Sequence, residues 1–156
     1  MTTNTIGLHI EKSAALVTSL NGLLSTYQIQ YMNARGFHWN VKGPNFFELH
    51  TKFEEIYNDL LMKVDEIAER ILTIEGAPLH AYSDYMSQSK ISEAKNISDG
   101  KSCVENLLQG YTTLIQMQRD ILQAAADADD EGTASLMSDY IKEQEKLVWM
   151  LRAYLN

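Results

Sequence analysis

The sequence predicts an all-α protein whose four long helices form one bundle. Apolar residues recur at the helical spacing in four long segments, and the alternation typical of strands is absent. Only two prolines and eight glycines interrupt the 156 residues. Apolar residues make up 45 % of the chain, which is enough for the core of a single domain spanning residues 1–156. Four such helices in one domain are typical of a four-helix bundle.

The first predicted helix runs from about residue 6 to residue 40. Its apolar residues follow each other at steps of three and four, so they share one face at about 100° per residue. They are Leu16, Leu20, Leu23, Tyr27, Tyr31, Ala34 and His38. His38 therefore falls on the face that should pack against the rest of the bundle.

The second helix is predicted between two breaks in the sequence. Gly43-Pro44-Asn45 separates it from the first helix, and it continues to about Thr73 before Gly76-Ala77-Pro78 stops it. A connection of about 25 residues follows, a length that suits a crossover running the height of a bundle. The helices before and after this crossover should then be parallel, with a short helix over residues 83–89 between them.

The third and fourth helices are predicted over residues 99–126 and 133–154. Cys103, Leu107, Leu114, Met117 and Ile121 lie in phase in the third helix. Met137, Tyr140, Ile141, Gln144, Val148, Leu151 and Leu155 lie in phase in the fourth. The acidic stretch DADDEGT separates the two helices.

The composition excludes several functional classes. The chain has 13 Lys and Arg residues against 21 Asp and Glu, a net charge of −8, which disfavours non-specific nucleic-acid binding by a single copy. The one cysteine, Cys103, excludes an intrachain disulfide. No apolar stretch approaches the roughly 18 residues that cross a bilayer, and no signal peptide is visible. We therefore expect a cytoplasmic protein without a membrane partner.

Four residues of metal-ligand type lie on one side of the second predicted helix. Around the helix axis, Glu54 lies about 40° from His50. Asp65 follows at about 60° and Glu69 at about 100°. Leucines share this side, and carboxylates buried among leucines are costly unless they are paired or bind a metal. One chain cannot gather all four around one ion, because His50 and Asp65 are about 22 Å apart along the helix.

Two copies of this helix could bring the ligands together by packing antiparallel about a two-fold axis near residue 60. His50 and Glu54 of one chain would then face Asp65 and Glu69 of the other. The two-fold symmetry would create two such clusters. His38 could reach the same place across the Gly-Pro break. Two imidazoles and three carboxylates suit iron, manganese or zinc. A metal-free dimer interface with salt bridges and hydrogen-bonded histidines explains the same spacing.

Residues 37–72 resemble the Dps proteins, the DNA-protecting proteins of starved cells within the ferritin superfamily. Two signatures carry the resemblance: HWNVKG with a second histidine twelve residues after the first, and DEIAER starting fifteen residues after that histidine. The similarity extends more weakly through EKLVWMLRAYL near the C-terminus. It implies a ferritin-like four-helix bundle that assembles as a hollow homododecamer.

The resemblance also implies a function. Dps proteins are ferroxidases, which oxidise Fe(II) with hydrogen peroxide in preference to dioxygen, store the ferric product and protect against oxidative stress. Their two-iron site is shared between two-fold related subunits, and no catalytic residue beyond the metal ligands is implied. The matching ligands are His38, His50 and Glu54 of one subunit with Asp65 and Glu69 of the other. Zinc or another divalent ion could replace iron in a crystal.

Three further features bear on this comparison. The family commonly has Asp where this chain has Glu54, and Trp39 matches a tryptophan beside the site. An acidic run falls where the family surrounds a three-fold pore for incoming ions: Asp127, Asp129, Asp130 and Glu131. The same acids could instead form a solvated loop that favours the following helix N-terminus.

Two other functions compete with this one. The alternative is a DNA-compacting nucleoid protein with a secondary metal role, but DNA-binding relatives often carry a lysine-rich tail, and the first twelve residues here contain only Lys12. DNA binding is therefore not expected. An ordinary ferritin with its site inside one chain needs Glu-x-x-His pairs, and the sequence contains none.

Overall fold

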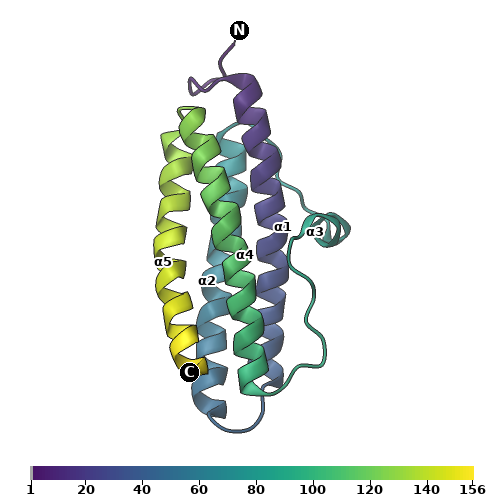
Figure 1. The fold of residues 1–156 in the computed structure, drawn as a ribbon. Coiled ribbons are helices and arrows are strands. Elements are labelled where there is room, and N and C mark those ends of the chain that lie inside the picture. The colour runs from purple at the N-terminus through teal and green to yellow at the C-terminus, as the bar shows by residue number, and fades with distance from the viewer. Residues whose placement is uncertain (1) are drawn as a thin grey trace.

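Four long helices packed side by side form the body of the molecule, as the computed structural model of residues 2–156 shows (Figure 1). The helices are α1 (Ile10–Asn40), α2 (Phe46–Thr73), α3 (Tyr82–Gln88), α4 (Gly100–Asp127) and α5 (Glu131–Leu155). Within residues 2–156 there is no strand longer than an isolated bridge. The all-α prediction is therefore confirmed. No helix in this part of the chain has both the length and the apolar character of a membrane span.

The connection between α2 and α4 is a crossover that runs along the outside of the bundle. It leaves the upper end of α2, forms the short helix α3 beside α1, and descends to the start of α4 at the opposite end (Figure 1). The two helices that it joins are parallel, as the length of the connection predicts. The predicted short helix is also confirmed, shifted by one residue from the expected range of 83–89.

The sequence placed the start of the first helix too early, whereas the second helix starts directly after the predicted break. The first helix begins at Ile10 rather than near residue 6, because the preceding residues fold back and bond to the end of α2. The Thr5 amide donates to Glu75 Oε2 at 2.7 Å, and the His9 imidazole caps the helix by accepting from the Lys12 amide. The second helix begins at Phe46, because Asn45 adopts the left-handed conformation with φ of 64° and ends the turn.

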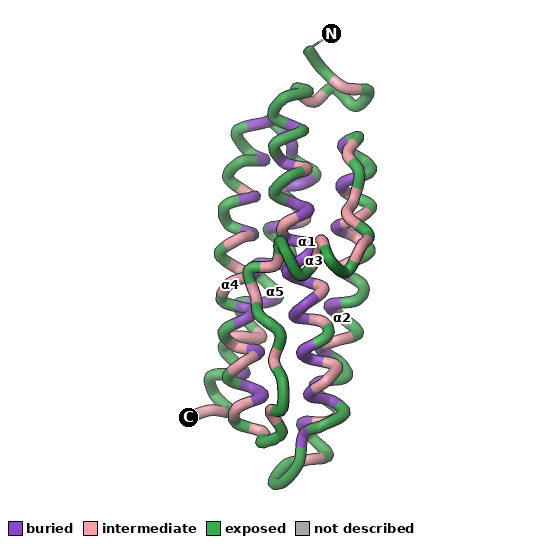
Figure 2. The backbone as a smooth tube through the Cα atoms, turned by 90° about the vertical axis from the view of Figure 1, so that its right-hand side faces the viewer, coloured by how far each residue is buried: buried purple, intermediate pink, exposed green. Residues whose placement is uncertain are grey.

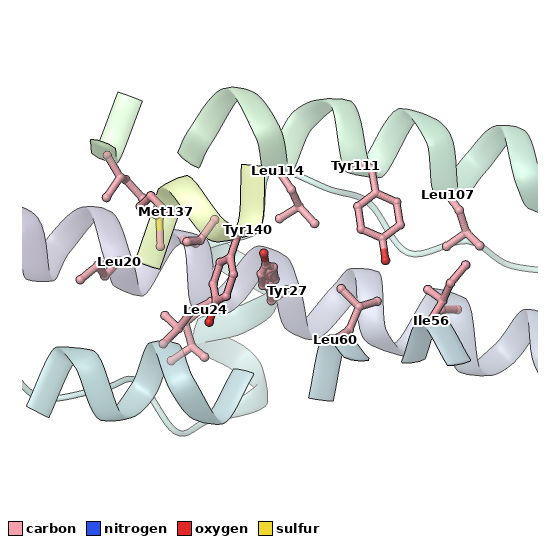
Figure 3. Packing of buried hydrophobic residues seen from close by; sticks show 14 of the residues in the cluster. Leu20, Leu24, Tyr27, Ile56, Leu60, Leu107, Tyr111, Leu114, Met137 and Tyr140 are labelled. Atoms are coloured by element: carbon pink, nitrogen blue, oxygen red, sulfur yellow. The ribbon is translucent and has the colours of Figure 1, made fainter. Parts of the chain in front are cut away.

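Buried residues occupy the inward sides of the four long helices, whereas the crossover is exposed or half-buried (Figure 2). The predicted stripe on α1 is buried along its length except at Tyr31, which is half-buried. Leucines of α1 and α4 interdigitate with those of α2, and Tyr27, Tyr111 and Tyr140 cross the space between helices (Figure 3). Burial of these large side chains stabilises the bundle by roughly 1.5–3 kcal/mol each.

A hydrogen-bonded triangle occupies the middle of the bundle. The Tyr27 hydroxyl donates to Gln118 Oε1, Gln118 Nε2 donates to Gln144 Oε1 at 2.7 Å, and Gln144 Nε2 donates back to the Tyr27 oxygen at 2.8 Å. All three side chains are buried. Neutral amides and a phenol that satisfy one another offer no anionic ligand to a metal. The triangle itself thus offers no metal site.

Candidate metal centre

The Gly-Pro break folds α2 back on α1 so that His38 and His50 meet. Their imidazole rings stack with centroids 3.8 Å apart and planes 11° from parallel. His38 Nδ1 lies 2.6 Å from the backbone oxygen of His50, and His50 Nδ1 lies 2.7 Å from that of His38. Each histidine therefore holds the main chain of the other, and the two rings are fixed by a reciprocal pair of bonds across the turn.

This arrangement determines the tautomer of both rings. A carbonyl oxygen can only accept, so each Nδ1 must carry the proton and donate it. In the neutral imidazole the lone pair then resides on Nε2, the atom available to a metal. Backbone carbonyls commonly fix metal-binding histidines in this way. Each ring of the pair therefore keeps the lone pair of its Nε2 free of the Nδ1 hydrogen bond.

Aromatic rings surround the histidine pair on two sides. Tyr57 meets His38 edge-on with centroids 5.4 Å apart, and Phe46 stacks on His50 at 5.1 Å. His38 is buried and His50 is half-buried. These contacts restrict the rotation of both imidazoles, so little side-chain entropy is left to lose when an ion binds.

The three candidate carboxylates all lie on the exposed side of α2. Glu54, Asp65 and Glu69 are solvent-exposed, as are Leu61 at 48 % and Leu72 at 57 % of their surface. Asp65 raises the pKa of Glu69, first through a hydrogen bond between the two carboxyl groups and then through its negative charge. Asp65 and Glu69, in the C-terminal half of α2, thus form a second small group, separate from the histidine pair.

A single chain does not bring the two groups together. Within residues 2–156 no three His, Cys, Asp or Glu side chains lie close enough to hold one metal ion. The structure joins His38 to His50 and places Asp65 beside Glu69, one group toward each end of α2. Leu61 lies between these groups and Leu72 just beyond Glu69, and a monomer would leave both exposed to water.

Comparison with known proteins identifies the family. Residues 13–156 match the ferritin-like domain. The chain is 40 % identical to the DNA protection during starvation protein of Porphyromonas gingivalis over 95 % of its own length and 93 % of the relative's. It is 38 % identical to DNA protection during starvation protein 2 of Bacillus anthracis, with 90 % and 97 % covered. The chain belongs to the Dps family of the ferritin superfamily.

Solved Dps structures show the same fold. A Dps protein from Vibrio cholerae O1, described as a ferritin-like diiron-carboxylate protein, superposes with a TM-score of 0.98 at 54 % identity, covering 100 % of this chain and 98 % of that one. Dps from Staphylococcus aureus superposes with a TM-score of 0.88 at 35 % identity, covering 90 % and 95 %. The recognition made from HWNVKG and DEIAER is thereby confirmed.

Trp39 of this Dps protein lies beside the histidine pair and points outward. Its ring is 58 % exposed and packs against the Arg35 guanidinium at 4.9 Å. Arg35 also lies over the rings of Tyr31 and Tyr57, and it donates to the Tyr31 hydroxyl at 2.8 Å. We did not single out Arg35 from the sequence, although positions 31, 35 and 39 share one helix face at spacing four.

The acidic run between α4 and α5 divides into two parts. Asp130 is 1 % exposed, accepts from the Thr133 amide at 3.0 Å as the cap of α5, and pairs with Arg70 at 2.7 Å. Its carboxylate is fully used inside the subunit, so the expectation that it lines a pore does not fit the structure. Asp127, Asp129 and Glu131 are exposed.

Proposed function

We propose that this Dps protein is a ferroxidase and iron store. It oxidises Fe(II), preferably with hydrogen peroxide, at sites shared between two-fold related subunits, and it keeps the ferric product inside a hollow homododecamer. The single observation that carries the proposal is the reciprocal histidine pair at one end of an exposed helix face whose other end carries two adjacent carboxylates. Each group is half of a ligand set.

The ligand types suit iron as the substrate. His38 and His50 would supply two neutral Nε2 donors, and Glu54, Asp65 and Glu69 would supply anionic oxygens. Imidazoles bind Fe(II) well, and carboxylates favour the more highly charged Fe(III), so the set supports both oxidation states. The same set would also accept zinc, since nitrogen and carboxylate ligands serve that ion too. Glu54, longer by one methylene than the Asp common in the family, would reach further toward a second ion.

The exposed face of α2 supports sharing. Antiparallel packing of two α2 helices would place the histidine pair of one subunit against Asp65 and Glu69 of the other, and would do so twice. The same contact would remove Leu61 and Leu72 from water. Apolar burial would thus drive the association that completes the ligand set.

Two ferrous ions in one site would allow the complete reduction of hydrogen peroxide. Hydrogen peroxide needs two electrons to become water, and two ferrous ions can deliver both without releasing hydroxyl radical. The DNA protection in the names of its relatives would then follow from the removal of iron and peroxide. Exposed Asp127, Asp129 and Glu131 would raise the local concentration of Fe(II) where copies of this loop converge.

An anaerobic Fe(II) titration followed by peroxide tests the proposal. The native mass should be that of a dodecamer, and absorbance should report rapid oxidation of two ferrous ions per site. Asp65→Asn and Glu69→Gln remove ligand charge without changing side-chain volume, so both should slow oxidation strongly while the assembly survives. Glu105→Gln, which neutralises an exposed acid on α4, is the matched control. Unchanged initial rates in both α2 variants would show that these carboxylates are structural.

A further inference from the structure

Four tyrosines lead from the histidine pair into the bundle centre. We call them the tyrosine row: Tyr57, Tyr31, Tyr27 and Tyr140. Tyr57 touches His38 at 5.4 Å between ring centroids, and Tyr31 meets Tyr57 edge-on at 6.0 Å. Tyr27 is one turn of α1 from Tyr31, about 6 Å along the axis. Tyr140 meets Tyr27 edge-on with ring centroids 6.1 Å apart. The two rings lie side by side in Figure 3.

Tyr140, at the inner end of the row, differs from its neighbour Tyr27 in how it can release a proton. Oxidation of a tyrosine by one electron makes its hydroxyl strongly acidic, so a nearby base decides where the oxidised ring is stable. Tyr140 donates to Glu66 Oε1 at 2.7 Å, a carboxylate that can take the proton. The Tyr27 hydroxyl donates to the Gln118 amide oxygen, which is a far weaker base.

The surrounding charges also make Tyr140 easier to oxidise than the outer tyrosines. The Arg35 guanidinium donates to the Tyr31 oxygen at 2.8 Å and lies over the Tyr57 ring, so a positive charge faces the outer half of the row. Removing an electron there is opposed by that cation. At the inner end Lys63 lies 5.2 Å from the Tyr140 ring centroid, but its ammonium group is paired with Asp59 at 2.7 Å and Glu143 at 2.9 Å. The cation at Tyr140 is therefore neutralised, whereas no acidic partner of Arg35 is found within residues 2–156.

We propose that the tyrosine row is an electron-transfer path that supplies one electron from Tyr140 to the histidine-pair end of the subunit. It would act when peroxide meets a site holding a single ferrous ion, and in that respect it rests on the proposed function. Iron gives one electron and Tyr140 gives the other through the row. Peroxide takes up two protons from solvent and leaves as two water molecules. The phenolic proton passes to Glu66, and Tyr140 is left as a neutral radical in place of a free hydroxyl radical.

Ordinary packing makes a different prediction about substitutions. If the four rings only fill space, replacing Tyr by Phe removes a hydroxyl but affects no electron transfer. Tyr111 is the matched control, because it is as buried as Tyr27, and its hydroxyl has no partner within residues 2–156. It comes from α4, whereas Tyr27 comes from α1 and Tyr140 from α5 (Figure 3).

Assembled protein is loaded with one Fe(II) per site, mixed with peroxide and then frozen. Electron paramagnetic resonance records the radical. Wild type should give a tyrosyl signal that narrows when tyrosine is ring-deuterated. Tyr140→Phe should lose that signal. Tyr31→Phe should lower its yield without changing its shape, because the final ring is retained. Tyr111→Phe should match wild type, and an equal loss in Tyr140→Phe and Tyr111→Phe would overturn the proposal.

A metal-free arm separates the path from the iron chemistry. Azide radicals oxidise exposed tryptophans by one electron, and Trp39 is such a residue beside Arg35 and the outer tyrosines. The same tyrosyl spectrum should appear in metal-free wild type and be absent from Tyr140→Phe. If this spectrum appears in a protein that fails to oxidise iron, the ferroxidase proposal is refuted and the tyrosine row is supported. Iron oxidation with no Tyr140-dependent radical in either arm would refute the row alone.

Discussion

Mixing two inactive variants tests whether each site is built from two subunits. His50→Ala removes one proposed nitrogen ligand. It keeps the backbone oxygen of residue 50, which accepts the hydrogen bond from His38 Nδ1. Glu69→Gln removes a carboxylate at the other end of α2. Each variant alone should have damage in every shared site and should oxidise iron slowly.

The expected recovery follows from the two-fold arrangement. After random exchange of equal amounts, half of the dimers contain one subunit of each kind, and in these one site has both defects while the other has neither. About a quarter of all sites, half of the sites in half of the dimers, should therefore be intact. The initial rate of Fe(II) oxidation should rise to about a quarter of the wild-type value.

A second mixture supplies the control. His50→Ala and His38→Ala damage the same half of the ligand set, so no pairing of the two restores a complete site. That mixture should stay inactive after the same exchange protocol. If subunit exchange is verified by mass and the first mixture also stays inactive, the shared-site reasoning is refuted. Equal recovery in both mixtures would be just as damaging to it.

Three other outcomes are expected. Asp130→Asn removes the charge paired with Arg70 but can still cap α5, so it should lower the free energy of unfolding by about 1–3 kcal/mol. Asp130→Ala also removes the cap and should cost about 1 kcal/mol more. Urea unfolding measures both, with exposed Asp129→Asn as the control. Hydrogen bonds from the Ser102 backbone and side chain lower the pKa of Asp99, the cap of α4, so its contribution is present above the unfolded-state pKa and is lost as the pH falls through the lower folded-state pKa. Asp99→Asn should therefore flatten the acid limb of a stability–pH curve, and an unchanged limb would assign acid unfolding to other groups. Metal-free protein should not retard the migration of duplex DNA in a gel near neutral pH, because each chain carries a net charge of −8. Salt shortens the range of this repulsion but creates no attraction. A retarded band in a gel shift at moderate salt would reveal a local basic surface.

The long helices could be predicted from sequence because their core residues keep one period over many turns. Leu16, Leu20 and Leu23 are all buried where the period places them. The helix starts were harder, because they depend on contacts distant in sequence. Ile6 is apolar and in reach of the first helix, yet the chain before Ile10 is held by Glu75, some 70 residues away.

The candidate site divides in the same way. His38 and His50 could be paired from spacing alone, since a Gly-Pro turn that reverses the chain brings flanking residues together. The reciprocal bonds to backbone oxygens could not, because no residue type encodes which carbonyl a histidine will meet. Asp130 misled for a related reason: the sequence shows an acid in an acidic run, whereas Arg70, from the end of α2, decides that it is buried and paired.

The contents of the bundle centre explain why iron chemistry would need the surface of α2. A metal held between the four helices would need anionic ligands there, but Tyr27, Gln118 and Gln144 fill that volume and satisfy one another. The remaining ligand-type residues of α2 are separated by too much helix to act within one chain. Placing them on an exposed face with Leu61 and Leu72 joins two unfavourable features, apolar surface in water and carboxylates near one another. Packing a second α2 against this face would relieve the first, and a bound cation would relieve the second. Under the proposed function, assembly and iron binding should therefore stabilise each other, since each would remove a cost that the other leaves in place.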